Sequence, residues 1–270
     1  MENKTYALIT GACGGLGISF ALECAERGYH LILVDLPSSH PEKLEKFLSE
    51  NYPVQVKSFV ADLTQHEDIE LLVKNVKEKG LEVSLLVNNA GIGQNEFFED
   101  TDSSYMRKMI EVNCMSYISL TSALLPELKK QKKSHIINVS SLGGFYTLPR
   151  KTCYAATKGF VRQFSMALNM EVNKYGVYVS VLCPGPMTTN INNYILHRQL
   201  NWFSQKMMVH PRKVAQLTID KALKGQEIII PGRLNRVLHS VSSTIPSGIS
   251  KKLIMNSMKQ LEKKEQKNSV

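Results

Sequence analysis

Short apolar segments recur seven times along the chain, and each is followed by a longer segment in which polar and apolar residues alternate. The apolar segments span residues 6–9, 31–34, 54–60, 84–87, 135–139, 177–182 and 227–230. Strand-length apolar runs that alternate with amphipathic helix-length segments predict a parallel sheet covered by helices on both faces. We therefore expect an α/β fold with a doubly wound, seven-stranded parallel sheet.

The last part of the chain breaks this alternation. After Pro231-Gly232, apolar residues recur at helical spacing. The pattern is interrupted at Pro246 and then continues at helical spacing. This pattern predicts two short amphipathic helices with lysine-rich polar faces. We expect residues 1–232 to form one cofactor-binding catalytic domain and residues 233–270 to be a basic helical extension of that domain.

Charge is unevenly distributed over the 270 residues. The net charge is +9, and residues 201–270 carry thirteen Lys and Arg against four Asp and Glu, so this region accounts for the whole excess. A basic surface of this kind suits acidic lipid or an anionic carrier. Nucleic acid is not an expected partner, because the basic residues lack interleaved aromatics and any recognised module.

Other features indicate a cytoplasmic protein. The first residues run directly into an apolar strand, so we expect no signal peptide. The longest charge-free stretch, between Lys174 and Arg198, contains two prolines and is a poor membrane span. The five cysteines are odd in number and scattered, with no spacing typical of metal ligands, so we expect reduced thiols and no metal site.

A glycine-rich turn follows the first predicted strand and opens the next helix. It reads TGACGGLG, from Thr10 through Leu16 to Gly17. Gly11 allows the tight turn, Gly15 lets the backbone approach a pyrophosphate, and Gly17 lets the helix pack closely on the sheet. The helix N-terminus then faces the phosphates, which predicts dinucleotide binding.

Polar residues close the next three predicted strands. Asp35 ends the second strand, and a carboxylate there accepts hydrogen bonds from both hydroxyls of an adenosine ribose but repels a 2′-phosphate. The sequence thus favours NAD over NADP. Asp62 and the neighbouring Leu63 close the third strand, and residues 89–91 (Asn-Ala-Gly) close the fourth, where we expect them to line the adenosine site.

A second constellation lies downstream. Tyr154 and Lys158 are four residues apart, so on a helix they share one face, and a lysine cation there would favour the tyrosine phenolate. Ser141 precedes Tyr154 by thirteen residues and supplies a hydroxyl for the oxygen of a substrate. These residues predict acid–base chemistry at a carbonyl or alcohol.

Taken together, the motifs resemble those of the classical short-chain dehydrogenases/reductases. The resemblance covers residues 4–230 and includes TGACGGLG, Asp62, NNAG, Asn113, Ser141, YAATK and Pro184-Gly185 in the order of that family. It implies a Rossmann-type fold, a nicotinamide cofactor, and an active site of Asn113, Ser141, Tyr154 and Lys158. Family spacing selects Ser141 over the adjacent Ser140.

The resemblance also implies roles for these residues. Tyr154 is the general acid/base, Ser141 positions the carbonyl or alcohol, and Asn113 holds a water that relays protons. Lys158 binds the nicotinamide ribose and lowers the pKa of Tyr154.

It further implies the supports of the nicotinamide ring. Pro184 and Gly185 would back the ring, and Thr189 would contact its carboxamide. Read singly, each site residue could be structural: Asn113 a helix-kink residue, Ser141 a loop hydroxyl, Tyr154 and Lys158 a surface pair. Their joint occurrence favours the site.

Several functions are compatible with this site. The segment after Thr189 carries many apolar residues and is expected to form a lid, so we favour an NAD(H)-dependent oxidoreductase that interconverts a secondary alcohol and a ketone on a bulky apolar substrate such as a steroid, retinoid or acyl derivative. One alternative is a 3-oxoacyl reductase acting on carrier-linked chains, and another is a nonenzymatic dinucleotide-binding regulator. We expect a homo-oligomer and allow for peripheral membrane contact through the basic C-terminus.

Overall fold

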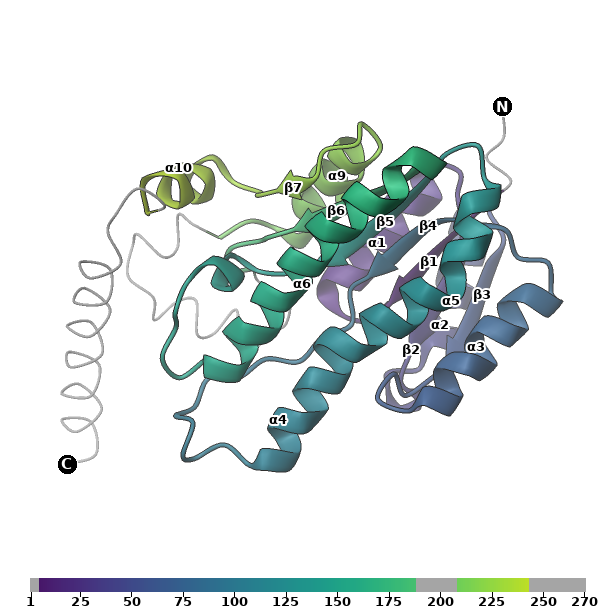
Figure 1. Ribbon diagram of the computed structural model, residues 1–270. Helices are drawn as coiled ribbons and strands as arrows, with labels where there is room; N and C mark the ends of the chain where they lie inside the picture. Colours follow the sequence, from purple (N-terminus) through teal and green to yellow (C-terminus); the bar gives the residue numbers. More distant parts are fainter. Residues whose placement is uncertain (1–4, 188–207, 243–270) are drawn as a thin grey trace.

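A seven-stranded parallel sheet forms the centre of the molecule in the computed structural model, which describes residues 5–187 and 208–242 (Figure 1). Its spatial order is β3-β2-β1-β4-β5-β6-β7, and every pair of neighbours is parallel. The strands are β1 (Tyr6–Thr10), β2 (His30–Asp35), β3 (Val56–Val60), β4 (Val83–Asn88), β5 (Ser134–Val139), β6 (Val177–Leu182) and β7 (Ile228–Ile229). All seven predicted strands are confirmed.

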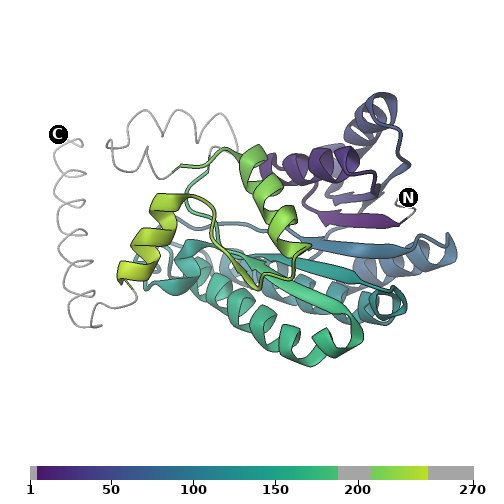
Figure 2. The same ribbon diagram turned by 90° about the horizontal axis from the view of Figure 1, so that it is seen from above.

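Helices connect the strands. They are α1 (Gly15–Glu26), α2 (Pro41–Asn51), α3 (His66–Glu78), α4 (Ser103–Ile110), α5 (Ser116–Lys130), α6 (Thr152–Val172), α9 (Pro211–Ala222) and α10 (Arg233–Ser242). Short one-turn elements are η1 (Pro37–Ser39), η2 (Glu111–Met115, a π-helix), η3 (Leu142–Phe145) and η4 (Asn173–Tyr175). Figure 2 shows α1 and α6 on opposite sides of the sheet.

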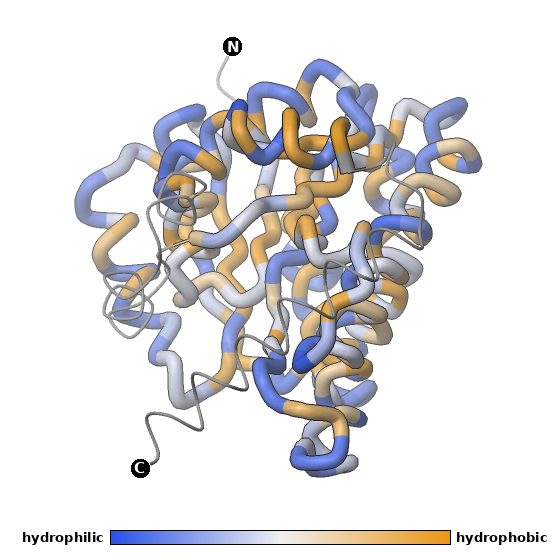
Figure 3. Tube along the Cα trace, turned by 90° about the vertical axis from the view of Figure 1, so that its left-hand side faces the viewer, coloured by the Kyte–Doolittle hydropathy of each residue, from blue (hydrophilic) through white to orange (hydrophobic). Residues whose placement is uncertain are grey.

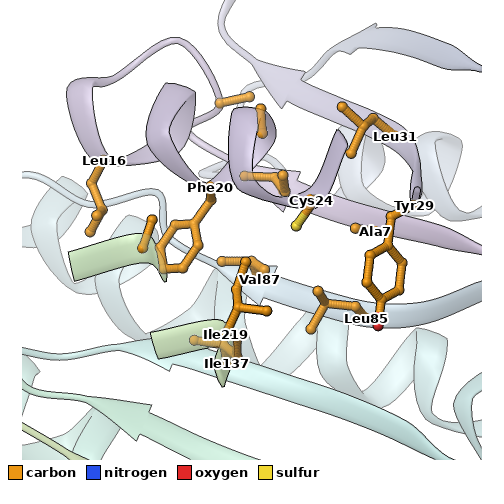
Figure 4. Close-up of a cluster of buried hydrophobic side chains, with 14 of the residues drawn as sticks. Ala7, Leu16, Phe20, Cys24, Tyr29, Leu31, Leu85, Val87, Ile137 and Ile219 are labelled. Atoms are coloured by element: carbon orange, nitrogen blue, oxygen red, sulfur yellow. The ribbon is translucent and has the colours of Figure 1, made fainter. Parts of the chain in front are cut away.

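Alternation along each strand divides the core between the two faces. On β1, Ala7 and Ile9 point into one cluster, whereas Tyr6 and Leu8 point into the other. The first cluster joins the sheet to α1, α2 and α9, and Figure 4 shows part of it. The second joins the sheet to α3, α5 and α6.

The hydropathy of the chain follows this layering. In Figure 3 the interior strands are mostly apolar, and the surrounding helices alternate between apolar and polar positions. Strands buried on both faces read as continuous apolar runs, which explains why the sequence locates them within about two residues. The largest difference is at β3, which begins at Val56 rather than at Val54.

The strand order reverses between β1 and β4. β1 pairs with β2 on one side and with β4 on the other, so the carboxyl ends of these two strands form the topological switch point of the sheet. Ligands of open α/β sheets bind at such a point. Most of the predicted site residues that the structure describes lie at or just after the carboxyl ends of strands, whereas Asn113, Tyr154 and Lys158 lie on helical segments.

Two predicted segments lie wholly or partly outside the described residues. These are the lid after Thr189 and the second C-terminal helix, whereas the first C-terminal helix is observed as α10. Among residues 5–187 and 208–242, none of the helices combines the length and apolarity required to cross a membrane.

Candidate active site

The glycine turn brings three backbone segments into direct contact. Gly11 has a φ of +61°, and a Cβ atom on it would lie 2.9 Å from the Cα of Ala90. A Cβ on Gly17 would lie 2.0 Å from the carbonyl oxygen of Gly11. Only glycine fits either position, so these residues are required for the close approach of β1, α1 and the end of β4.

The N-terminus of α1 is open to an anion. The helix begins at Gly15, its N-cap Gly14 makes no side-chain hydrogen bond, and its first turn contains no acidic residue. The amide groups of Gly15, Leu16 and Gly17 are therefore not occupied by a side-chain cap, and they lie at the positive end of the helix dipole. This arrangement fits the pyrophosphate of a dinucleotide.

Thr10 and Asn89 join the glycine turn to β4. The Thr10 hydroxyl accepts hydrogen bonds from the amides of Asn89 at 3.0 Å and Ala90 at 3.1 Å. The Asn89 side chain donates to the carbonyl oxygens of Thr10 and Gly11 at 2.9 and 3.0 Å. The predicted phosphate turn and the predicted ribose loop thus form one hydrogen-bonded unit.

Asp35 lies beside this turn, as expected for a residue that recognises the adenosine ribose. Its carboxylate accepts hydrogen bonds from the amides of Cys13 and Leu36, both at 2.8 Å. Burial, together with the same carboxylate, raises the pKa of the Cys13 thiol to about 11. Cys13 is accordingly a protonated thiol at neutral pH.

Asp62 shapes the turn that follows β3. It accepts hydrogen bonds from the amide of Thr64 at 3.0 Å and from its hydroxyl at 2.8 Å, and its own amide donates to Asp68. Leu63 is buried in the core cluster shared with α3. This places Asp62 at the carboxyl edge of the sheet, beyond Asp35, where an adenine would lie in the proposed arrangement.

The Ser141 and Tyr154 side chains meet beside Gly143. A Cβ on Gly143 would lie 3.4 Å from the Ser141 Oγ and 3.7 Å from Cε1 of the Tyr154 ring, and the Ser141 Oγ accepts a hydrogen bond from the Gly143 amide at 3.0 Å. The neighbouring Ser140 is 2% exposed and donates to the carbonyl of Lys158 at 2.7 Å. Ser141 is thus the serine whose hydroxyl faces Tyr154, and Ser140 holds β5 against α6.

Lys158 lies deeper, under the same tyrosine. It is 4% exposed, its Nζ donates to the carbonyl of Val139 at 2.9 Å, and Nζ is 5.9 Å from the centroid of the Tyr154 ring. Burial lowers the pKa of Lys158 to about 8. A Cβ on Gly91 would lie 3.3 Å from this Nζ, so Gly91 leaves the space that the lysine occupies.

The expected lowering of the Tyr154 pKa is wrong for the chain as described. Burial raises the pKa of Tyr154, and the nearby Ser141 hydroxyl opposes this rise only in part. Spacing placed Lys158 on the correct helix face, but its ammonium group bonds to Val139 and its own pKa is low. Desolvation is therefore the dominant influence on the Tyr154 pKa.

Asn113 lies in the π-helical turn η2 between α4 and α5. Its side-chain amide accepts a hydrogen bond from the Ile92 backbone amide at 2.9 Å and donates one to the Ile92 carbonyl at 3.0 Å. This pair of bonds resembles the pairing of two residues on neighbouring strands. It also donates to Thr157, whose hydroxyl donates to the carbonyl of Tyr154. Asn113 thus connects the loop after β4 to the helix that carries Tyr154 and Lys158.

The loop after β6 carries Pro184 and Gly185. The Pro184 carbonyl accepts a hydrogen bond from the Leu142 amide at 2.9 Å, which holds this loop against the residue that follows Ser141. Gly185 packs against Asn235 of α10. Thr189, the predicted contact of the carboxamide, lies outside the described residues.

Sequence reasoning missed Tyr117 and Asn235. Tyr117 is fully buried, donates to the Ala90 carbonyl at 3.0 Å, and lies under Lys158 with Nζ 5.8 Å from its ring centroid. Asn235 is 1% exposed. Neither belongs to a recognisable motif; the one available signal for Asn235 was a polar residue on the apolar face of an amphipathic segment.

Neither metal binding nor an activated thiol is supported by the described part of the chain. Residues 5–187 and 208–242 contain no cluster of His, Cys, Asp and Glu that could hold a metal ion. Burial raises the pKa of Cys153, the cysteine next to Tyr154. Burial also raises the pKa of Cys114, in this case to about 11. Both thiols are protonated at neutral pH.

Comparison with known proteins agrees with this geometry. Residues 5–200 match the family model for short chain dehydrogenase. A very-long-chain 3-oxoacyl-CoA reductase of Phaeosphaeria nodorum is 35% identical over 191 residues, which cover 68% of this chain and 55% of the relative. The chain thus spans little more than half the length of that relative. An uncharacterized oxidoreductase of Staphylococcus saprophyticus is 30% identical over 79% of this chain and 88% of its own.

Solved structures share the fold. The bulky-bulky ketone specific alcohol dehydrogenase of Comamonas testosteroni matches with a TM-score of 0.75 and 26% identity, covering 91% of this chain and 96% of that one. A short-chain dehydrogenase of Sphingobium yanoikuyae in complex with NADPH matches with a TM-score of 0.76 and 24% identity, covering 90% of this chain and 96% of that one. A short-chain dehydrogenase/reductase of Burkholderia phymatum in complex with NAD matches with a TM-score of 0.75 and 23% identity, covering 85% of this chain and 89% of that one.

The family match covers most of the chain and coincides with the part of the fold that brings Ser141, Tyr154 and Lys158 together. It also coincides with the glycine turn that fits a dinucleotide. The chain belongs to the family of short chain dehydrogenases.

Proposed function

We propose that the protein interconverts a secondary alcohol and a ketone on a bulky apolar substrate, with NAD(H) as the cofactor. The observation that carries the proposal is the meeting of the Ser141 and Tyr154 hydroxyls above the buried Lys158. A bound nicotinamide cofactor supplies or accepts the hydride. The chain has to hold the substrate oxygen and move one proton.

Tyr154 is the proposed proton donor to the carbonyl oxygen in the reductive direction. Its raised pKa keeps the phenol protonated at neutral pH, which suits a group that donates a proton. Ser141 is held by the Gly143 amide, and its hydroxyl would turn from Tyr154 to donate to the same substrate oxygen when substrate is bound. Both donors lie on the turn and helix that follow β5, so one rigid unit positions the reacting oxygen.

Lys158 and Asn113 are proposed to support this donor. Lys158 holds a positive charge below the Tyr154 ring, where it stabilises the phenolate that forms after the proton leaves. Asn113 fixes the loop after β4 relative to α6, and its proposed water is the source of the replacement proton.

Asp35 supports NAD(H) over NADP(H). Its carboxylate is fixed beside the glycine turn by the Cys13 amide, where a 2′-phosphate would meet a negative charge. Related structures of the same fold hold NADPH or NAD, and we assign the choice in this chain to Asp35. Replacing Asp35 by Ser is expected to reduce the preference for NADH over NADPH by at least about tenfold in kcat/KM, an effect that steady-state kinetics with both cofactors will measure.

A 3-oxoacyl thioester is the second candidate substrate. The name of the Phaeosphaeria relative, a very-long-chain 3-oxoacyl-CoA reductase, supports a 3-oxo group on a long acyl chain. The basic C-terminal region would then receive the anionic carrier. The nonenzymatic regulator is no longer proposed, because the family is one of oxidoreductases.

The partners are also proposals. Exposed apolar side chains on α4, α6 and η2, among them Ile110, Met115 and Phe160, support a homo-oligomer built through these elements. The exposed Val237 and Val241 of α10, in a basic region, support peripheral membrane contact of an otherwise cytoplasmic protein.

The decisive experiment measures consumption of NADH and NADPH with steroid, retinoid, small-ketone and 3-oxoacyl thioester substrates. Tyr154→Phe removes the donor hydroxyl and is expected to lower kcat at least about a thousandfold. Tyr175→Phe, at an exposed tyrosine of η4, is the matched control and should leave kcat unchanged. Turnover that survives Tyr154→Phe would contradict the proposed role, and activity confined to thioesters would select the second candidate.

A further inference from the structure

α10 contacts the loop that carries Pro184 and Gly185. Asn235, in the first turns of α10, is 1% exposed and donates to the Pro231 carbonyl at 3.0 Å. A Cβ on Gly185 would lie 2.7 Å from the Asn235 side-chain nitrogen, and a Cβ on Gly232 would lie 2.9 Å from it. The Asn235 side chain therefore fills space that two glycines leave open.

The same face of α10 contacts the turn after Ser141. His239 lies four residues beyond Asn235, so the two share one helix face. Its ring centroid is 4.1 Å from that of Phe145, and its Nδ1 is 3.3 Å from the Tyr146 hydroxyl oxygen. The guanidinium of Arg162, on α6, lies 4.7 Å from the centroid of the Phe145 ring. Phe145 thus contacts both α10 and the helix that carries Tyr154.

These two contact regions are joined inside the site. The Leu142 amide donates to the Pro184 carbonyl at 2.9 Å, and Leu142 directly follows Ser141. α10 therefore reaches one segment through Gly185 and the other through Phe145 and Tyr146. The hydrogen bond from Leu142 to Pro184 therefore joins the two segments that α10 contacts.

We propose that Asn235 and His239 are positioning residues, through which α10 clamps the Pro184–Gly185 loop against the turn that carries the Ser141 hydroxyl. The role in catalysis rests on the proposed function, because Ser141 and Pro184 act there on the substrate and beside the nicotinamide. The outer face of α10 takes no part: Val237, two residues from each, is 58% exposed. Releasing either contact allows the Leu142 amide and the Pro184 carbonyl to separate. The Ser141 hydroxyl and the Pro184–Gly185 loop then move apart as well.

Hydrogen exchange of the Leu142 amide tests the clamp without substrate or nucleotide. Asn235→Ala and His239→Ala are each expected to speed exchange at Leu142 by about tenfold, with exchange at Ile137 in β5 unchanged. Val237→Ala, on the outer face of the same helix, is the matched control. Exchange at Leu142 within about twofold of the wild type in both variants would overturn the proposal, as would equal acceleration at Ile137, which reports general destabilisation.

A double substitution tests the contact between Asn235 and Gly185 directly. Gly185→Ala places a methyl group against Asn235 and is expected to speed Leu142 exchange by about tenfold; adding Asn235→Ala removes the clash and should leave exchange no faster than in Asn235→Ala alone. Independent, multiplying effects of the two substitutions would overturn the contact as the route of the coupling.

Turnover separates this proposal from the proposed function. The clamp predicts that Asn235→Ala and His239→Ala lower kcat by about tenfold with little change in the nucleotide KM, and that His239→Phe, which keeps the ring against Phe145, restores most of kcat. If the wild type turns over no substrate while Leu142 exchange responds as expected, the proposed function fails and the clamp stands. If turnover depends on Tyr154 but neither α10 variant changes kcat or Leu142 exchange, the clamp fails and the function stands.

Discussion

The nucleotide side and the catalytic side of the proposed site are held together by different interactions. On the nucleotide side, β1, α1 and β4 approach so closely that backbone touches backbone, with Gly11 and Gly17 at the contacts. On the catalytic side, buried side chains form the connections: Asn88 donates to Asn138 at 2.8 Å, and Asn138 donates to Ser165 at 3.0 Å. All three side chains are fully buried.

This difference determines what each side tolerates. A close backbone contact leaves no room for added atoms, since any side chain at Gly17 would overlap the Gly11 carbonyl. A buried polar network tolerates changes of shape but requires that each donor and acceptor stay paired. The nucleotide side should therefore be most sensitive to added atoms, and the catalytic side to lost hydrogen bonds.

The largest expected effect is that of Gly17→Ala. The new methyl carbon would lie 2.0 Å from the Gly11 carbonyl oxygen, so α1 or the turn has to move. We expect the free energy of unfolding to fall by about 3 kcal/mol, and nucleotide affinity to fall with it. Urea unfolding and fluorescence titration with NADH will measure the two effects.

Gly14→Ala is the control for this substitution. Gly14 has a φ of −73°, and its added Cβ would meet only the Gly11 carbonyl, at an ordinary 3.4 Å. Stability within about 0.5 kcal/mol of the wild type is expected. Equal losses in the two variants would mean that the close approach at Gly17 is not what makes the turn rigid.

Asn138→Ala is the corresponding test of the catalytic side. It leaves the Asn88 amide and the Ser165 hydroxyl each without one partner in the interior of the protein. We expect a loss of about 2 kcal/mol in the free energy of unfolding, measured by urea unfolding. Asn75→Ala removes a solvent-exposed hydrogen bond from a half-buried residue of α3 and should cost far less; similar costs would argue against the importance of burial.

The nucleotide side was largely predictable from the sequence, for the same reason that it is rigid. Close backbone contacts require glycine at fixed positions, so Gly11 and Gly17 leave a visible spacing. Strands buried on both faces likewise leave apolar runs, from which all seven were predicted. The pairing of Tyr154 with Lys158 follows from helical periodicity.

The remainder was not predictable because it depends on residues far apart in the chain. Tyr117 contacts Lys158 and Asn235 contacts Gly185 only after the sheet has formed, and neither pairing has a characteristic spacing. The prediction of a lowered Tyr154 pKa was wrong for a related reason. Spacing gives the direction of a side chain on a helix, but the pKa depends on total burial, which is a property of the whole fold.

Lys158→Met should reveal a stability cost on the catalytic side. Burial lowers the pKa of Lys158 to about 8, so the charged form is less stable in the native protein than in water. Methionine has a similar shape and no charge, although it loses the bond to Val139. We expect the free energy of unfolding at pH 7 to rise by about 1 to 2 kcal/mol, while turnover is lost.

The pH dependence of this gain follows from the native pKa lying below the unfolded value. Between the ordinary pKa of 10.5 and about 8, the unfolded chain binds the proton and the native chain does not, so the wild type loses stability as the pH falls through that range. The advantage of Lys158→Met should be full below pH 8 and vanish as the pH rises toward 10.5. An advantage that is constant with pH would show that packing, not charge, is responsible.

The smallest effect is expected at the outer edge of the nucleotide side, where ion pairs tie α1 to α9. Glu23 is buried and pairs with Arg27 at 2.6 Å and with Arg212 at 3.6 Å, and Arg27 also pairs with Asp220 of α9 at 2.7 Å. Glu23→Gln keeps the shape and a hydrogen bond but removes the charge, and should lower the free energy of unfolding by about 1 kcal/mol. Glu50→Gln, which breaks an exposed pair with Lys46, should change it by less than about 0.5 kcal/mol. Because a buried pair is screened less by salt than an exposed one, the loss at Glu23 should persist in concentrated salt; if it disappears there, the α1–α9 contact depends on its apolar residues alone.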